Sequence, residues 1–214
     1  MRLRKIKNAQ DKLLTIDYVE LLPISHKGEW HKRFDNHNPI YCEIGMGKGA
    51  FITKSAQKNP EMNYIGLEKE ESIVWKATQK LDAKLENVLF VVGDASEFDM
   101  MFEENELDGL FLNFSDPWPK ARHAKRRLTF KTFLDKYHKV LKPKAKIIMK
   151  TDNYSLYEFS LEQFHESQFR IIAKHENLHK VKNDIITTEY EEKFTGLGKQ
   201  IYYIEVENEK DEII

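Results

Sequence analysis

The chain has 214 residues, which is enough for one domain with a full hydrophobic core. Hydrophobic residues make up 41% and charged residues 32%, and the net charge of −1 excludes a polycation that coats nucleic acid without selection. A single cysteine excludes an intramolecular disulfide and makes a cysteine-based zinc site implausible, so we expect no metal.

The chain carries no sign of membrane targeting. The start, MRLRKIKNAQ, is charged and lacks the apolar stretch of a secretory signal. No run of about 18 apolar residues offers a membrane span. We therefore expect a cytoplasmic protein with no membrane contact.

Charge is unevenly distributed along the chain. Basic residues gather at the amino terminus and again in residues 120–127, whereas the carboxyl end is acidic. Because the chain is nearly neutral overall, a local basic cluster is informative about binding. We predict a basic, partly flexible segment at 1–38, a single domain at 39–208 and an acidic tail at 209–214. We hypothesise that the first segment is an arm that becomes ordered when it binds a negatively charged partner.

Short apolar runs alternate with longer helical patterns. The runs predict strands at 40–45, 64–68, 88–94, 107–116, 146–152, 169–173 and 200–206. Helical spacing covers 47–59, 69–85, 127–141 and 154–167. The pattern predicts an α/β fold: a doubly wound, mostly parallel seven-stranded sheet with helices on both faces. We expect the last strand to be antiparallel because no helix is predicted between it and the strand before it.

Acids stand at or near the carboxyl ends of these strands. Glu68, Asp94, Asp116 and Asp152 end or follow four of them, and Glu43 lies one step inside the first. Each acid taken alone could simply cap the next helix. In an open α/β sheet, however, ligands bind outside the carboxyl ends of the strands, so the row favours a ligand rich in hydroxyl and amine donors, or a cation.

A glycine loop follows the first strand in the sequence EIGMGKGAF, residues 43–51. Gly45, Gly47 and Gly49 allow a tight turn and close approach of the backbone to a ligand. Glu68, about 20 residues on, suits a ribose diol, and this combination also fits NAD. Glu43 favours S-adenosylmethionine instead, since a carboxylate there would repel a pyrophosphate but attract an ammonium and a sulfonium. Asp94 is then placed to accept from the adenine amino group.

The most unusual stretch is NFSDPWPKARHAKRRL, residues 113–128. Asp116 precedes Trp118, which stands stiffly between two prolines and could stack on a base or pack against the core. The basic run behind it could be a solvated face. Because it borders the predicted ligand crevice and contains no acid, we favour contact with nucleic-acid phosphates.

The DPWPKxRHxKRRL pattern, with EIGxGKG, TDN at 151–153 and TEYEEKF at 188–194, resembles the bacterial tRNA (guanine-N7)-methyltransferase family. The resemblance runs from Glu43 to the last strand. It implies a class I, Rossmann-like methyltransferase domain that uses S-adenosylmethionine to make 7-methylguanosine at position 46, in the variable loop of tRNA.

The resemblance also implies roles for individual residues. Methyl-donor binding falls to Glu43, Gly45, Gly47, Glu68, Asp94 and Asp116, and Asp116 is also the catalytic residue. Contact with the target nucleotide falls to Lys120, Asp152, Thr188, Glu189, Tyr190 and Glu191. Contact with the rest of the RNA falls to Arg122, His123, Ala124, Lys125, Arg126 and Arg127.

Guanine N7 carries an in-plane lone pair and no proton, so it needs no general base to attack a methyl group. Catalysis should come from alignment and electrostatics, and the product base is cationic. We therefore hypothesise that Asp116 orients the base and stabilises its charge, helped by Asp152 and Glu191. Tyr190 could stack on the base or pack under Phe194.

Two other classes of function stay open. A nucleotide-dependent dehydrogenase would explain the glycine loop but leave residues 116–127 without a role. An inactive RNA-binding module with the same fold should have lost crevice acids, and all of them are present. Either a monomer or a homodimer is compatible with the sequence.

Overall fold

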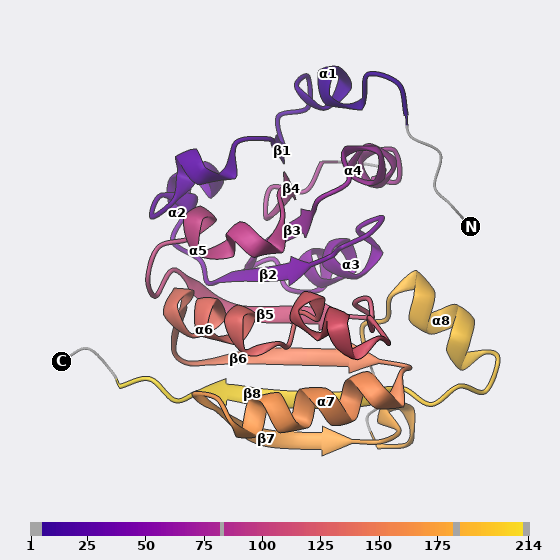
Figure 1. The fold of residues 1–214 in the computed structure, drawn as a ribbon. Helices are drawn as coiled ribbons and strands as arrows, with labels where there is room; N and C mark the ends of the chain where they lie inside the picture. Colours follow the sequence, from indigo (N-terminus) through magenta and orange to yellow (C-terminus); the bar gives the residue numbers. More distant parts are fainter. Residues whose placement is uncertain (1–5, 82–83, 182–184, 212–214) are drawn as a thin grey trace.

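The computed structural model describes residues 6–81, 84–181 and 185–211. In this part of the chain eight strands form one sheet in the order β1-β4-β3-β2-β5-β6-β8-β7 (Figure 1). The strands are β1 Val19–Glu20, β2 Ile40–Ile44, β3 Asn63–Glu68, β4 Val88–Val92, β5 Leu107–Asn113, β6 Leu141–Thr151, β7 Phe169–His175 and β8 Tyr202–Asn208. Among the described residues, no helix has both the length and the apolar character that a membrane span requires.

The sheet is mostly parallel, as predicted. β1 to β6 pair in parallel, with registers such as Ile40 opposite Asn63 and Cys42 opposite Leu110. β8 is antiparallel to both β6 and β7. The expected count of seven strands is one too low, because β1 also joins the edge of the sheet beside β4. A strand of two residues is too short to show any periodicity in the sequence.

The expected absence of a helix before the last strand is wrong, although the antiparallel direction of that strand is confirmed. A 3₁₀ turn, η4 (Leu178–Lys180), and helix α8 (Glu189–Thr195) lie between β7 and β8. Figure 1 shows α8 beyond the carboxyl end of β6 instead of along a face of the sheet. It therefore does not form the crossover that a parallel connection needs.

The four long predicted helices are present, each shorter than its sequence pattern. They are α3 (Ala50–Lys58), α4 (Glu71–Thr78), α6 (Lys131–Val140) and α7 (Tyr154–His165). Short helices fill several connections: α1 (Ala9–Leu13), α2 (Trp30–Phe34) and α5 (Phe98–Met101), with the 3₁₀ turns η1 (Pro23–His26), η2 (Ala95–Glu97) and η3 (Ala121–Arg126).

Hydrophobic side chains alternate between the two faces of the sheet. On β3, Ile65 and Leu67 belong to one buried cluster together with α2, α5, α6 and α7, whereas Tyr64 belongs to a second cluster with α1, α3 and α4. Successive strand residues point to opposite faces, so the two clusters are the two cores of a doubly wound sheet.

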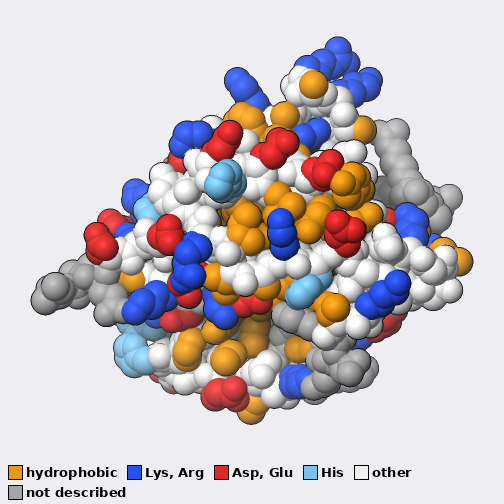
Figure 2. Space-filling model, turned by 90° about the horizontal axis from the view of Figure 1, so that it is seen from below, with side chains coloured by type: hydrophobic (Ala, Val, Ile, Leu, Met, Phe, Trp, Pro, Cys, Tyr) orange, Lys and Arg blue, Asp and Glu red, His pale blue; other side chains and the backbone are white. Residues whose placement is uncertain are grey.

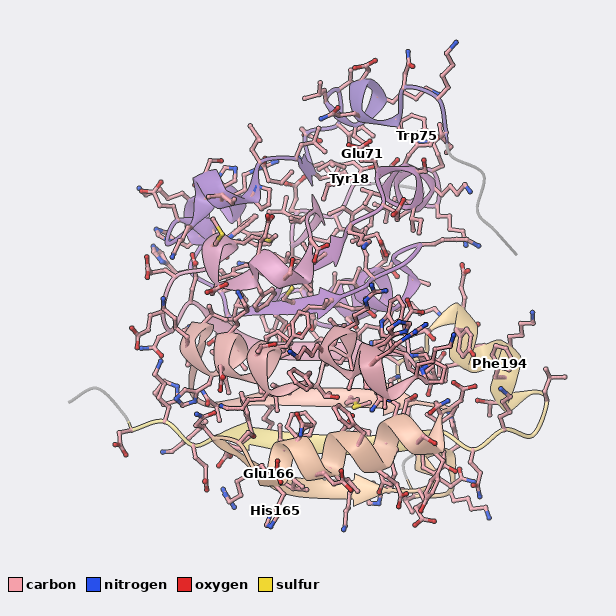
Figure 3. The ribbon with its side chains drawn as sticks, viewed as in Figure 1. Tyr18, Glu71, Trp75, His165, Glu166 and Phe194 are labelled. Atoms are coloured by element: carbon pink, nitrogen blue, oxygen red, sulfur yellow. The ribbon has the colours of Figure 1, made fainter. Side chains whose placement is uncertain are left out.

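Residues 6–38 pack on the rest of the domain: β1 joins the sheet, α1 contacts α4, and η1 contacts α5. Trp30 is fully buried, and its indole N–H donates a 2.9 Å hydrogen bond to the Met101 carbonyl oxygen. The Nζ atom of Lys12 on α1 lies 5.1 Å from the ring centre of Trp75, the α4 residue labelled in the upper part of Figure 3. Residues 1–5 of the predicted flexible segment lie outside the described residues, and the boundary at 38/39 stays a prediction.

Figure 2 shows the face that is seen from below in Figure 1. Hydrophobic side chains gather in its middle, with basic and acidic side chains interspersed around them. Positive charge therefore does not dominate this face, and a basic surface for nucleic acid has to be sought elsewhere on the molecule.

Candidate active site

The glycine loop between β2 and α3 presents its backbone to open space. The amides of Gly45 and Met46 donate to the carbonyl oxygen of Leu67 on the neighbouring strand, at 2.8 and 3.1 Å. Gly45 has φ +76° and Gly47 has φ +57°, and a Cβ at either position would meet no atom within 4 Å. The positive φ angles favour glycine, and the open space lets a ligand approach the main chain closely.

Two cavities meet at this loop, and Gly45 and Phe114 line both. The larger has a volume of about 890 Å³. Six residues that the sequence predicted for the site line it: Gly45, Glu68, Asp94, Asp116, Lys125 and Arg126. The smaller has a volume of about 220 Å³, and its lining also includes six of the residues that the sequence predicted for the site: Glu43, Gly45, Gly47, Thr188, Glu189 and Tyr190. The carboxyl ends of parallel strands share one edge of the sheet, which is why residues so distant in sequence meet here.

The acids of the larger cavity stand in different environments. Burial raises the pKa of Glu68, and its Oε1 accepts a 3.1 Å hydrogen bond from the Glu70 amide. The Ser96 amide donates at 2.8 Å to Asp94 Oδ1, and this bond holds the pKa of Asp94 below its ordinary value. Asp116 is exposed at the cavity. All three can accept hydrogen bonds from hydroxyl and amine groups of a ligand.

Glu43 is buried, and only one of its two carboxyl oxygens accepts a hydrogen bond from a described residue. It is 2% exposed, and the Asn113 side-chain amide donates to its Oε1 at 2.8 Å. Its Oε2 has no hydrogen-bond partner among the described residues. Burial raises the pKa of Glu43 to about 7, against the opposing effects of Asn113 and the Lys150 ammonium. A ligand with an ammonium group in the smaller cavity would supply the missing partner.

Glu191, which was predicted to contact the target nucleotide, is instead held by contacts within the protein. It is fully buried, with Lys150 Nζ 2.6 Å from its Oε2 and His179 Nε2 2.9 Å from its Oε1. It also completes a capping box with Thr188, whose Oγ1 accepts from the Glu191 amide at 2.9 Å. Contact between Glu191 and a nucleotide stays a prediction, and it would require α8 to move.

Tyr190 and Asp152 lie together at the edge of the site. The Tyr190 ring packs 5.0 Å from that of Phe114 and 4.2 Å from that of Phe194, the α8 residue labelled in Figure 3. Its hydroxyl donates to Asp152 Oδ2 at 3.2 Å, and Lys199 Nζ lies 2.7 Å from the same oxygen. Tyr190 is 41% exposed, so it packs on its neighbours and still presents ring surface to a ligand.

The basic stretch forms η3 beside the larger cavity. The side chains of Lys120, Arg122, Lys125 and Arg126 are exposed. The Arg126 guanidinium lies 4.8 Å from the ring centre of Trp118, which therefore packs within its own loop while it lines the cavity. The His123 ring makes an edge contact with the Trp118 ring, with their centres 5.8 Å apart. Ala124 is half-buried.

Comparison with known proteins identifies the family of this chain. Residues 37–204 match the family model described as "Putative methyltransferase". A tRNA (guanine-N(7)-)-methyltransferase of Alkaliphilus oremlandii is 47% identical over 94% of this chain and 97% of its own. The chain belongs to the tRNA (guanine-N7)-methyltransferase family. Members from Brevibacillus brevis and Streptococcus thermophilus are 44% and 46% identical, over 96% and 97% of this chain and 97% and 99% of their own.

Solved structures of other methyltransferases share the fold of this family member. An antibiotic-related methyltransferase has a TM-score of 0.63 at 19% identity, covering 84% of this chain and 92% of its own. The 16S rRNA methyltransferase KamB has a TM-score of 0.65 at 14% identity, covering 85% and 93%. These likenesses confirm the class I methyltransferase fold.

The structure brings eleven of the eighteen predicted site residues together around the two cavities. The lining of neither cavity includes Lys120, Arg122, His123, Ala124, Arg127, Asp152 or Glu191. Sequence reasoning missed Asn113 and Lys150, which contact Glu43 and Glu191 from beneath the site. The signal that could have pointed to Lys150 is its place directly after the apolar run Ile147, Ile148 and Met149 near the end of β6, because a buried cation needs a buried acid.

Proposed function

We propose that this enzyme transfers the methyl group of S-adenosylmethionine to N7 of guanine 46 in the variable loop of tRNA. The observation that carries the proposal is the composition of one cavity. Glu68 and Asp94 line it where a nucleoside would be held, Asp116 lines it from the DPWP loop, and Lys125 and Arg126 line it from the basic stretch. The names of the relatives support the same reaction and substrate.

The residues present fit the methyl donor, which brings a sulfonium-activated methyl group to the site. Glu68 would accept from the ribose hydroxyls, and Asp94 from the adenine amino group. The orphaned Oε2 of Glu43 would accept from the amino group of the methionine part. The open approach to Gly45 and Gly47 leaves room for the ligand against the backbone.

The protein's part in catalysis is to orient the guanine and stabilise its charge. N7 attacks without losing a proton, so Asp116 does not act as a general base. The carboxylates of Asp116 and Asp152 would accept from the guanine N1 and N2 groups and favour the positive charge that develops on the ring. Thr188, Glu189 and Tyr190 bound the smaller cavity and would position the nucleotide.

The exposed cations of η3 would bind tRNA phosphates. Arg122, Lys125 and Arg126 project from this short segment, and Lys125 and Arg126 line the larger cavity. Lys120, just before η3, would contact the target nucleotide. Phosphate contacts bind without reading sequence, so they would fix where the tRNA lies relative to the pocket.

The proposal is tested by methyl transfer from labelled S-adenosylmethionine to unmodified tRNA, followed by identification of the product base. Wild type should yield 7-methylguanosine. Asp116→Asn and Asp116→Ala should lower kcat/KM by about 10²- to 10³-fold, the usual effect of losing a group that stabilises charge in the transition state. Glu166→Gln is the matched control, since this exposed acid lies at the end of α7 that is remote from α8 (Figure 3).

Label in another base would keep the methyl transfer and reject the specificity for guanine N7. Binding of S-adenosylmethionine without transfer to any tRNA would favour the inactive RNA-binding alternative. Unchanged kcat/KM in both Asp116 variants would reject the role proposed for that residue.

A further inference from the structure

Arg127, the last cation of the basic stretch, points into the protein. Its Nε donates to the carbonyl oxygen of Pro117 at 3.1 Å, and its Nη2 donates to that of Trp118 at 3.1 Å. Its guanidinium also lies 4.3 Å from the ring centre of Phe159 on α7. Arg127 is half-buried, in contrast to the exposed Arg122, Lys125 and Arg126.

The carbonyl groups that Arg127 holds belong to a strained loop. Residues 114–120 form neither helix nor strand. Phe114 and Trp118 have φ angles of +52° and +41°, in the left-handed region that residues with a side chain rarely adopt. Such conformations persist where the surrounding structure holds them in place, and two hydrogen bonds from one planar group are a restraint of that kind.

Asp116 depends on this loop for its position. Its side chain is exposed, and within the described part of the chain no hydrogen bond or ion pair holds its carboxylate. The position of the carboxylate in the larger cavity is therefore set by the backbone on which it stands. The neighbouring carbonyls at Pro117 and Trp118 are the ones that Arg127 fixes.

We propose that Arg127 is a positioning residue for Asp116 and does not contact RNA. Its two hydrogen bonds to the carbonyl oxygens of Pro117 and Trp118, together with its packing on Phe159, form what we call the clamp. The exposed cations of η3 supply positive charge to the tRNA. The catalytic consequence rests on the proposed function, whereas the clamp itself is a property of the protein alone.

Replacing Arg127 by lysine distinguishes a clamp from a phosphate contact. Lysine keeps the positive charge, so a phosphate contact would survive Arg127→Lys to a large extent. A single ammonium cannot reproduce the planar fork that reaches two successive carbonyl groups, so a clamp would be lost. The clamp therefore predicts that Arg127→Lys behaves like Arg127→Ala, and the phosphate contact predicts that it behaves like wild type.

The experiment compares wild type, Arg127→Lys, Arg127→Ala and, as a matched control, Arg122→Ala. Amide hydrogen exchange of residues 114–120 is measured without tRNA, and kcat and the salt dependence of tRNA binding are measured in parallel. Both Arg127 variants should exchange faster in this segment and lose kcat by a factor on the order of 100, as expected when a reacting group is displaced by about 1 Å. Their salt slope should equal that of wild type.

Arg122→Ala should show the opposite behaviour, with unchanged exchange and a salt slope smaller by about 1. If Arg127→Ala does not fold, Arg127→Lys carries the comparison. Wild-type exchange and kcat in Arg127→Lys, with a reduced salt slope in Arg127→Ala, would overturn the proposal. Faster exchange in the Arg127 variants of an enzyme that methylates no tRNA would refute the proposed function and leave the clamp standing.

Discussion

Lys150 on β6 and Glu191 in the first turn of α8 form a buried ion pair, with Nζ and Oε2 2.6 Å apart. Lys150 also donates to the carbonyl oxygen of Ile186 at 3.0 Å, and its ammonium lies 5.0 Å from the ring centre of Phe51. Burial lowers the pKa of Lys150, and the negative charge of Glu191 opposes this effect. This pair ties α8, which carries part of the smaller cavity, to the central sheet.

Replacing Lys150 should therefore destabilise the folded protein. Lys150→Met leaves the buried Glu191 carboxylate with only His179 as its side-chain partner, which should lower the free energy of unfolding by about 3–5 kcal/mol. The control is Lys146→Met on the same strand. Lys146 pairs with Glu205 at 2.8 Å and is half-exposed, so its loss should cost about 0–1 kcal/mol.

Urea unfolding of the two variants measures both effects. Adding Glu191→Gln to Lys150→Met should recover part of the loss, because the uncompensated charge is then removed. Equal losses for Lys146→Met and Lys150→Met would contradict the importance assigned to the buried pair.

Glu43→Gln should stabilise the protein in a pH-dependent way. The folded pKa of about 7 lies above the ordinary value of 4.5, so the wild-type carboxyl is neutral in the folded protein at low pH and must ionise at high pH while buried. Its contribution to stability is present below pH 4.5 and is lost as the pH rises through 7. The variant should therefore gain on the order of 3 kcal/mol at about pH 8, and nothing at about pH 4.5.

Unfolding free energies of Glu43→Gln and wild type between about pH 4.5 and about pH 8 check this difference. Calorimetry at the upper end of this range should show weaker binding of S-adenosylmethionine by the more stable variant, since the carboxylate that accepts from its amino group is gone. A stability difference that does not vary with pH would show that Glu43 does not titrate in this range.

The predicted site depended on a rule of topology, and the sequence did not show the directions in which its side chains point. Glu68 and Asp94 could be placed in one crevice because parallel strands end at a common edge. The sequence could not show that Arg127 turns inward while Arg126 does not, since Arg126 ends a six-residue 3₁₀ segment and Arg127 follows it, and so short an element has no pattern that separates its faces. Nor could it reveal that Glu191 is held by Lys150, because their 2.6 Å contact joins residues far apart in the chain.

The structure answers part of the question about Tyr190. Since its ring packs between Phe114 and Phe194, Tyr190→Phe should keep this packing and lower kcat/KM by less than about tenfold, the value of one hydrogen bond to Asp152. Tyr190→Ala removes the ring, and should lower kcat/KM by more if the ring also stacks on the guanine, whose stacking is worth about 1–3 kcal/mol. Steady-state kinetics on both variants would assign the effect to the hydroxyl if the losses are equal.

Residues 2–5 should add to tRNA affinity through charge alone. Deleting residues 1–5 removes Arg2, Arg4 and Lys5, so binding should weaken and the salt slope should fall by about 0.7–0.9 for each phosphate that these cations neutralise. Filter binding at several salt concentrations measures both quantities. The same affinity and salt slope in the shortened protein would reject the hypothesis that residues 1–5 bind tRNA.

The most direct test of the proposed reaction replaces guanine 46 of an unmodified tRNA with 7-deazaguanine. This base keeps the N1 and N2 groups that Asp116 and Asp152 would bind, and it lacks only the nitrogen that accepts the methyl group. With labelled S-adenosylmethionine, we expect methylation of the guanine-containing tRNA, no methylation of the deaza tRNA, and inhibition of the first reaction by the second tRNA. Equal methylation of both tRNAs would contradict the assignment of N7 of guanine 46 as the target.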